Sequence, residues 1–312
     1  MRAFKYGTAK DYLLAMNVVM PDGTLVPIGG KTLKNVAGLD LLRLFAGSEG
    51  TLGIITSLRL KVLPKPPARG VLTAYFDNVH NAGKAIISIY KEGNIPSAME
   101  ILDKSALKAI QIFKPGTGID VADAMLLIEF EGTSSSVREQ GQRVSSTLKT
   151  HGSRDIQFSQ DTTEMDRLWE ARSVVGASAS VLKEGYNRVY QGEDICVPLA
   201  EIPGILLELR KIRDKHGLGC LIFGHVSIGS LHPAITIRKS QAGDWEKVKE
   251  MAREIHELAI RVGGTVTGEH GIGVARKAFM RIQNPEAFKI MEKIKHALDP
   301  NNIMNPGKIF DA

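Results

Sequence analysis

The first 65 residues combine short strands with a glycine-rich tract. Alternating apolar positions in residues 12–28, YLLAMNVVMPDGTLVPI, interrupted by Pro-Asp-Gly, predict two strands joined by a tight turn. Residues 39–45 favour a short helix, and residues 54–62 favour a third strand. A cluster of prolines then breaks the pattern, so we predict a domain boundary near residue 66.

From about residue 70 onward, strands alternate with longer helices. The predicted strands lie near 71–76, 98–102, 124–130, 193–198, 219–225 and 234–239, and the helices near 80–92, 104–113, 134–150, 200–216, 244–262 and 285–298. Ser136 and Glu139 form a capping-box pattern. Apolar residues of the helix that begins near Asp244 recur at three- and four-residue spacing, which predicts a stripe facing the core. Two β-α-β-type units with antiparallel pairing predict an α+β cap of ferredoxin-like halves.

Composition narrows the class of protein. The chain has 312 residues, 43% hydrophobic and 24% charged, which is typical of a soluble globular protein of about two domains. Neither a membrane-spanning run nor a signal peptide is evident, so we expect a cytoplasmic protein, with attachment to a membrane surface as the alternative. Cys196 and Cys220 lie in apolar runs outside any Cys-x-x-Cys spacing, which predicts two buried thiols.

The net charge of +6 raises the question of nucleic-acid binding. Lys and Arg are interspersed with Asp and Glu along helices such as residues 244–261, so a solvated surface explains the charge better. Attraction of small anions is the second interpretation. We therefore expect no nucleic-acid partner.

A glycine-rich motif, GSEGTLG, covers Gly47–Gly53. Its three glycines let the backbone approach a ligand and turn amides toward a phosphate-like group. An ordinary glycine-rich turn is the alternative. The motif alone therefore leaves its role open.

Two histidines flank a short loop in FGHVSIGSLHP. A strand that ends at His225 and a strand that starts at His232 would place both imidazoles at one end of neighbouring strands, within reach of one ion. Zinc accepts neutral imidazole readily. A polar turn with hydrogen-bonded histidines is the alternative.

Two more candidates follow in GGTVTGEHGIG, and one precedes it in WEAR. Glu269 and His270 would diverge in a strand, but the flanking glycines permit a bend that brings both into one cavity. Glu269 could then complete a two-histidine metal site, and His270 is a candidate general base. Arg172, on a predicted helix, suits a carboxylate. Salt bridges at the surface are the alternative in both cases.

Taken together, these motifs resemble the family of FAD-linked oxidases with a vanillyl-alcohol-oxidase-type flavin domain, in its glycolate oxidase and D-lactate dehydrogenase branch. The likeness also includes Lys5-Tyr6-Gly7, NVAGLDLLRLFAGSEGTLGIIT and DPNNIMNPGK, and runs over nearly the whole chain. It implies a partial FAD-binding domain of the PCMH type at residues 1–65 and a substrate- and metal-binding cap at 66–297. A return to the flavin domain is implied at 298–312.

The resemblance also implies a function and a site. The function is FAD- and metal-dependent oxidation of a small D-2-hydroxy acid, of the lactate or glycolate type, to the 2-oxo acid. Electrons would pass to a quinone, a cytochrome or an iron–sulfur protein. The implied roles are metal binding, usually of zinc, by His225, His232 and Glu269, proton abstraction by His270, substrate-carboxylate binding by Arg172, and flavin contact by Gly47, Ser48, Gly53 and Asn305.

This chain departs from the family pattern in three places. The family usually reads His-Ala-Gly-Asp-Gly-Asn-Leu-His between the histidines, where this chain has Ile228 and Ser230 at the Asp and Asn positions. Ala234 replaces an Asn of the 2-hydroxyglutarate branch, which argues against a bulky dicarboxylic substrate. Family members also place about half of the flavin domain, with its pyrophosphate loop, before the Lys-Tyr-Gly segment.

Three explanations follow for that shorter beginning: a partner chain completes the flavin domain, the chain is truncated, or it binds no FAD. Two alternative functions follow as well. One is a non-catalytic or partner-dependent cap subunit, and the other is a metal-dependent hydrolase built on His225, His232 and Glu269. Apolar surface left by an incomplete flavin domain predicts an oligomer.

Overall fold

The computed structural model describes residues 2–181, 185–238 and 241–311. The chain divides into two compact units, Met1–Tyr6 with Pro66–Gly268 and Gly7–Lys65 with Glu269–Ala312. The division between Lys65 and Pro66 falls at the boundary predicted near residue 66, whereas residues 1–6, expected in the flavin domain, group with the first unit. The return to the second unit comes at Glu269, well before residue 298, because side chains of the helix over 285–298 pack on the second unit's core.

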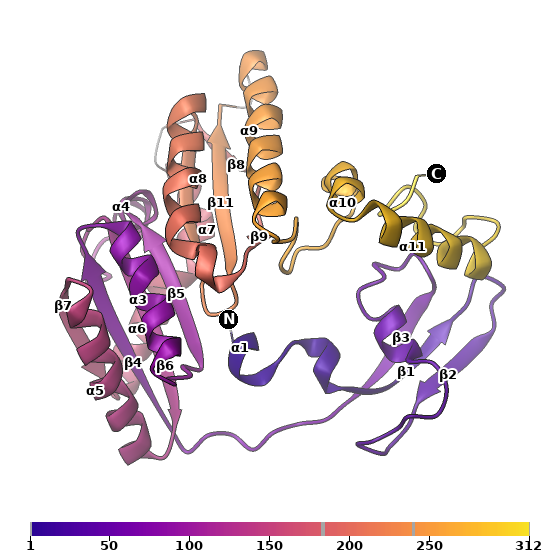
Figure 1. The fold of residues 1–312 in the computed structure, drawn as a ribbon, viewed down its shortest axis with the longest axis horizontal. Coiled ribbons are helices and arrows are strands. Elements are labelled where there is room, and N and C mark those ends of the chain that lie inside the picture. Colours follow the sequence, from indigo (N-terminus) through magenta and orange to yellow (C-terminus); the bar gives the residue numbers. More distant parts are fainter. Residues whose placement is uncertain (1, 182–184, 239–240, 312) are drawn as a thin grey trace. The chain divides into compact units, whose positions relative to one another are not determined.

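The first unit is built on an eight-stranded antiparallel sheet (Figure 1). Seven strands follow the order β7-β4-β6-β5-β10-β11-β8, and β9 pairs with β11. Their bounds are β4 Ala68–Phe76, β5 Ala98–Asp103, β6 Ala124–Gly132, β7 Ser153–Ser159, β8 Asn187–Val189, β9 Ile195–Cys196, β10 Gly219–His225 and β11 Ser230–Ile237. The expected α+β class with antiparallel pairing is confirmed.

Helices cover both faces of this sheet. The larger apolar core lies under α3 (Val79–Lys91), α5 (Ser134–Thr150), α8 (Ile202–His216) and α9 (Ala242–Arg261). The second core lies under α4 (Lys104–Phe113), α6 (Thr162–Ser173) and α7 (Val175–Ser178). The stripe predicted for α9 is confirmed, because Val248, Met251, Ile255 and Leu258 are all buried. Short helices α1 (Ala3–Tyr6), η2 (Ala179–Val181) and η3 (Leu199–Glu201) complete the unit.

One capping prediction was wrong. Helix α5 begins at Ser134, and its N-cap is Thr133, whose side chain accepts a hydrogen bond from the amide of Ser136. The helix therefore starts too early for Ser136 to cap it. Strand β7 was not predicted. It lies at the edge of the sheet, and its sequence, SRDIQFS, lacks the regular alternation of a half-buried strand.

The second unit contains a three-stranded antiparallel sheet in the order β2-β1-β3. The predicted hairpin is present as β1 (Leu13–Val19) and β2 (Leu25–Gly29), and β3 spans Ile54–Leu60. Helices η1 (Ala9–Tyr12), α2 (Leu41–Phe45), α10 (Lys277–Gln283) and α11 (Pro285–Leu298) accompany it. All seven residues of β3 are exposed although the strand carries four large apolar side chains.

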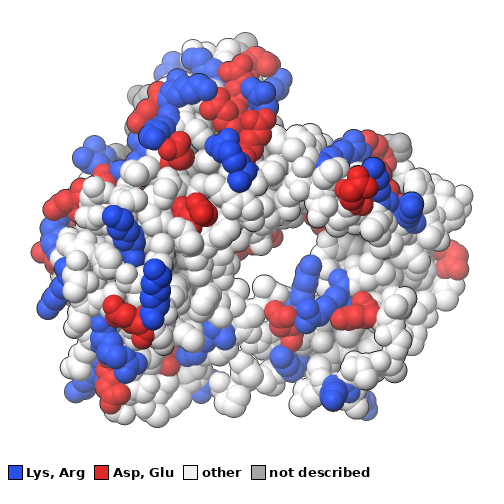
Figure 2. Space-filling model, viewed as in Figure 1, with Lys and Arg blue, Asp and Glu red and all other residues white. Residues whose placement is uncertain are grey.

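The prediction of two buried thiols holds for Cys220 but not for Cys196, which is only partly buried. Both cysteines are free thiols. Basic and acidic side chains intermingle on the face shown in Figure 2, as expected of a solvated charged surface. Among the described residues, no helix combines the length and apolar character needed to cross a bilayer.

Candidate functional site

The two loop histidines stand on neighbouring strands of the first unit. Strands β10 and β11 form a hairpin in which Phe223 faces His232 and His225 faces Ser230. The imidazole rings of His225 and His232 lie 5.1 Å apart, centroid to centroid, at an interplanar angle of 80°. Both side chains are buried. The predicted placement of the two imidazoles at one end of neighbouring strands is therefore confirmed, while metal binding stays a prediction.

A buried carboxylate joins His225 to Arg172. Glu100 lies on β5, is completely buried, and approaches Nδ1 of His225 to 2.7 Å. The same carboxylate accepts a hydrogen bond of 2.9 Å from Nε of Arg172 on α6. Arg172 is only 7% exposed, so its ion pair is buried rather than superficial. A carboxylate at one imidazole nitrogen fixes the orientation of the ring, as in many metal-bound histidines.

Asp194 anchors the loop that precedes Glu269. It is completely buried and adopts a left-handed backbone conformation, with φ of 70°. Its carboxylate accepts hydrogen bonds from the hydroxyl of Thr267 at 2.6 Å and from the amide of Gly268 at 3.0 Å. Glu269 and His270 follow Gly268 directly in the chain. The two hydrogen bonds to Asp194 therefore fix the backbone from which both side chains extend.

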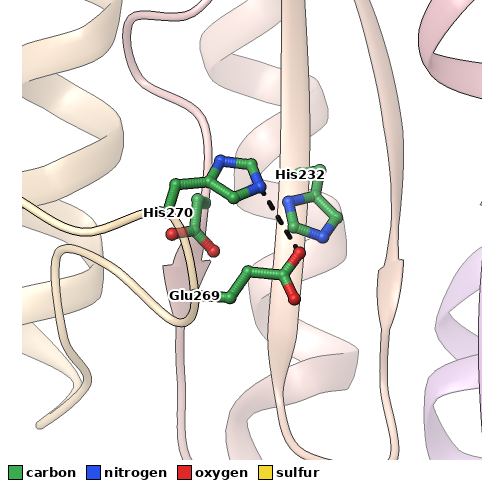
Figure 3. Close-up of side chains that lie close together, drawn as sticks. His232, Glu269 and His270 are labelled. Carbon is green, nitrogen blue, oxygen red and sulfur yellow. Dashed lines mark ion pairs between the residues drawn. The ribbon is translucent and has the colours of Figure 1, made fainter. Parts of the chain in front are cut away.

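Four side chains bring potential metal ligands together. One ligand atom from each of Asp194, His232, Glu269 and His270 lies within 4.8 Å of the others. Figure 3 shows His270 and Glu269 beside His232, with Nε2 of His270 3.4 Å from Oε1 of Glu269. The bend expected at the glycines is therefore present. Asp194 and His270 join the predicted His232 and Glu269 in this ligand cluster, and metal binding by His225 stays a prediction.

Sequence reasoning missed Glu100 and Asp194. Both are acidic residues next to or inside apolar strands, in AMEILD and EDICV. A carboxylate that a strand buries must have a partner, so its presence in an apolar run is itself a signal. The partner cannot be identified this way, because Glu100 and His225 are far apart in the chain.

Within the second unit, Glu49 holds the segment that follows His270. Its carboxylate oxygens accept hydrogen bonds from the amides of Ile272 at 2.7 Å and Gly273 at 2.8 Å. A Cβ on Gly271 would lie 2.8 Å from Oε1 of Glu49, and its φ is +80°, so a side chain would not fit there. Asn305 donates from Nδ2 to the backbone oxygen of Glu49. The glycine-rich motif thus fixes the stretch after the predicted base.

The other predicted flavin contacts have internal roles as well. A Cβ on Gly53 would lie 2.7 Å from a methyl group of Val18, so close packing on β1 demands glycine there. Gly47 has a φ of +89°, which favours glycine at this turn. The backbone oxygen of Ser48, a buried residue, accepts the hydroxyl of Thr51. These contacts explain the motif's shape, and its contact with flavin stays a prediction.

A buried ion pair ties the C-terminal segment to the same motif. Lys295 on α11 pairs with Asp299, the C-cap of that helix, and Nζ of Lys295 also donates to the backbone oxygens of Thr51 and Met304 at 2.9 Å each. Asp299 accepts the amide of Met304 at 2.8 Å. Burial raises the pKa of Asp299, but hydrogen bonds from Lys295 and from backbone amides lower it by more, so the net pKa lies below the ordinary value.

This depressed pKa gives a pH prediction for the second unit. Asp299 stabilises the folded state above its unfolded pKa of about 3.9, and the contribution is lost as the pH falls through the lower folded pKa. We expect hydrogen-exchange protection of the Met304 amide, corrected for intrinsic exchange, to fall below about pH 5. In Asp299→Asn, protection should already be low at neutral pH and nearly flat across that window. The same pH dependence of Met304 protection in the wild type and in Asp299→Asn would contradict this role.

Comparisons with known proteins give one family match and several related proteins. Residues 65–309 match the family described as FAD linked oxidases, C-terminal domain. The chain is 35% identical over 311 residues to the glycolate oxidase subunit GlcD of Bacillus subtilis, and 34% identical over 310 residues to GlcD of Escherichia coli. It is 30% identical over 315 residues to a D-lactate dehydrogenase of Archaeoglobus fulgidus.

These matches cover 99% of this chain but 65%, 61% and 67% of the respective relatives. The chain thus spans about two thirds of their length. Among solved structures, 4-ethylphenol oxidase from Gulosibacter chungangensis aligns with a TM-score of 0.73 at 16% identity, over 96% of this chain and 65% of that one. This second likeness shows a shared fold.

Proposed function

Because the chain belongs to the family of FAD linked oxidases through their C-terminal domain, we propose that it takes part in FAD- and metal-dependent oxidation of a small D-2-hydroxy acid. Lactate and glycolate represent the substrate type, since relatives are named for both. The product is the corresponding 2-oxo acid. Electrons would leave through an acceptor protein or a quinone.

The ligand cluster is the observation that carries the proposal. Two imidazoles and two carboxylates within 4.8 Å of one another suit a divalent cation such as zinc. Asp194 and His232 are buried, whereas Glu269 and His270 are exposed. The site would therefore combine buried ligands on β11 and just before β9 with accessible groups toward a substrate.

The chain's own residues would divide the work between binding and proton transfer. Arg172 would hold the substrate carboxylate through its planar guanidinium, which Glu100 keeps in place. His270 would accept the proton of the substrate hydroxyl at an imidazole nitrogen. When bound, the metal would lower the pKa of that hydroxyl and FAD would accept the hydride from C2. Gly47, Ser48, Gly53 and Asn305 are the residues proposed to lie against the flavin.

Metal binding can be tested without turnover. His232→Ala removes a buried ligand from the ligand cluster, and we expect its zinc affinity to fall by more than about 100-fold, beyond the range of outer-sphere substitutions. His151→Ala is the control, because His151 contacts Ser88 far from the cluster in sequence. Zinc titration against a chromogenic chelator measures both variants. Equal zinc affinity in wild type and His232→Ala would overturn the metal site.

Dependence on a partner is the second candidate function, favoured by strand β3. This edge strand exposes Ile54, Ile55, Leu58 and Leu60. Exposed apolar edges invite pairing with another strand. We propose that a further polypeptide segment covers β3 and completes the flavin domain. Flavin binding that appears only when such a segment is supplied is the expected result.

A further inference from the structure

A partly open cavity of about 360 Å³ lies in the first unit. It is lined by Arg2, Arg69, Ala98, Trp169, Arg172 and Ser173. Small-molecule sites usually measure about 300–1,000 Å³, so this volume suits a compact metabolite. Three of the six lining residues are arginines, which is the feature that needs an explanation.

Glu129 on β6 organises two of these arginines. It is completely buried, and its Oε1 accepts Nε and Nη2 of Arg2 at 3.0 and 2.6 Å. Its Oε2 accepts Nε of Arg69 at 3.2 Å and the indole N–H of Trp169 at 3.0 Å. Each arginine binds Glu129 through Nε and Nη2. Nη1 of both guanidinium groups is therefore available to another acceptor.

The charges of this group do not balance. Burial raises the pKa of Glu129, but hydrogen bonds from Arg69 and Arg2 lower it by more, so the carboxylate is ionised at neutral pH. Two cations then share one anion. The neighbouring Glu131 also acts electrostatically on Arg2, but it is paired with Lys5, so three cations stand against two anions and one positive charge remains in excess. A positive excess beside a cavity with low-dielectric walls attracts an anion.

Arg172 supplies a second cationic side to the same cavity. Its own countercharge is Glu100, which it shares with His225. Ala98 lies between the two sides, because it pairs with Glu129 across the strands and is two residues from Glu100 on the same face of β5. The small side chain leaves open space between Arg172 and the Arg2–Arg69 pair.

We propose that this cavity is a second anion subsite, and that the preferred small 2-hydroxy acids carry a distal carboxylate bound by Arg2 and Arg69. The inference rests on the proposed function, in which Arg172 holds the first carboxylate. Lactate, with six non-hydrogen atoms, would fill only about half of the space if each atom took the roughly 30 Å³ of a water molecule.

The sequence prediction that opposes this substrate class rests on Ala234. Ala234 is completely buried on β11, where it pairs with Leu221 and belongs to the second apolar core of the first unit. Packing against apolar neighbours explains its small side chain. Ala234 also shares a face of β11 with His232, so the sequence argument against a bulky dicarboxylic substrate stays a prediction, which the comparison of acids decides.

The test compares two acids on the full chain by calorimetry at constant ionic strength. D-malate should bind at least about tenfold more tightly than D-lactate, which corresponds to about 1.4 kcal/mol. Arg69→Gln and Arg2→Gln should each remove most of the tighter binding of D-malate. The affinity for D-lactate should stay within about twofold of the wild-type value. The side chain of Arg2 is 49% exposed, so its replacement leaves the fold intact even if Arg69→Gln does not.

Arg210→Gln is the matched control, because Arg210 is a partly buried arginine paired with Asp123 outside this cavity. It should change neither affinity. Equal binding of both acids by the wild type, or equal losses for both in Arg69→Gln, would overturn the subsite. If neither acid binds, the proposed function fails, and succinate then tests the cavity alone. Succinate binding weakened by Arg69→Gln supports the subsite, and absence of succinate binding overturns it.

Discussion

Replacing His270 by alanine is expected to lower turnover of D-lactate or D-malate by about 10²–10⁴-fold, the usual contribution of a positioned general base. The expected loss lies in kcat, because Arg172 and the remaining ligands would still bind substrate. Zinc content should be retained, since Asp194, His232 and Glu269 remain in the ligand cluster. Turnover would be measured with FAD and an artificial electron acceptor, with zinc analysis of the same sample.

Two further measurements separate a base from a metal ligand at His270. Added imidazole should restore part of the activity of His270→Ala if the lost group is a base, because small imidazoles can enter the exposed site. His296→Ala is the control, an exposed histidine on α11 of the same unit. Loss of zinc without rescue would assign His270 to the metal, and unchanged turnover would remove it from the mechanism.

The helices and most strands of this fold follow from local patterns. The bounds predicted for residues 104–113, 134–150 and 285–298 coincide with α4, α5 and α11. Amphipathic spacing fixes such segments because each helix buries one stripe. Strands β7 and β8 were missed, since a polar edge strand and a three-residue strand carry little alternation. The early return at Glu269 depends on tertiary packing of α11, which no local pattern encodes.

The candidate site was predictable only in part, for the same physical reason. His225 and His232 are joined by a tight hairpin, so spacing alone placed them together. Glu100 reaches His225, and Glu129 reaches Arg69, through strand pairing over long sequence distances, and a sequence shows the buried carboxylate but not its cation. Asp194 is likewise far in the sequence from the other residues of the ligand cluster, so its place there could not be predicted. Long-range pairing, not residue type, is the missing information.

Breaking the Glu100–Arg172 pair should be costly for the first unit, because both side chains are buried. Glu100→Met leaves a guanidinium that is 7% exposed without its countercharge, and we expect a loss of about 3–5 kcal/mol in the free energy of unfolding. Arg172→Met should cost less, because Glu100 keeps His225 as a partner. The double variant should be more stable than the sum of both losses predicts, by about 0.5–3 kcal/mol.

Urea unfolding followed by tryptophan fluorescence suits this cycle, since both tryptophans, Trp169 and Trp245, lie in the first unit. Lys211→Met is a suitable control, because it breaks the exposed ion pair between Lys211 and Glu208. It should change the free energy of unfolding by less than about 1 kcal/mol. Additive losses in the double variant would mean that Glu100 and Arg172 act independently. Arg172 would then be held by its packing against Phe223, and Glu100 would serve His225 alone.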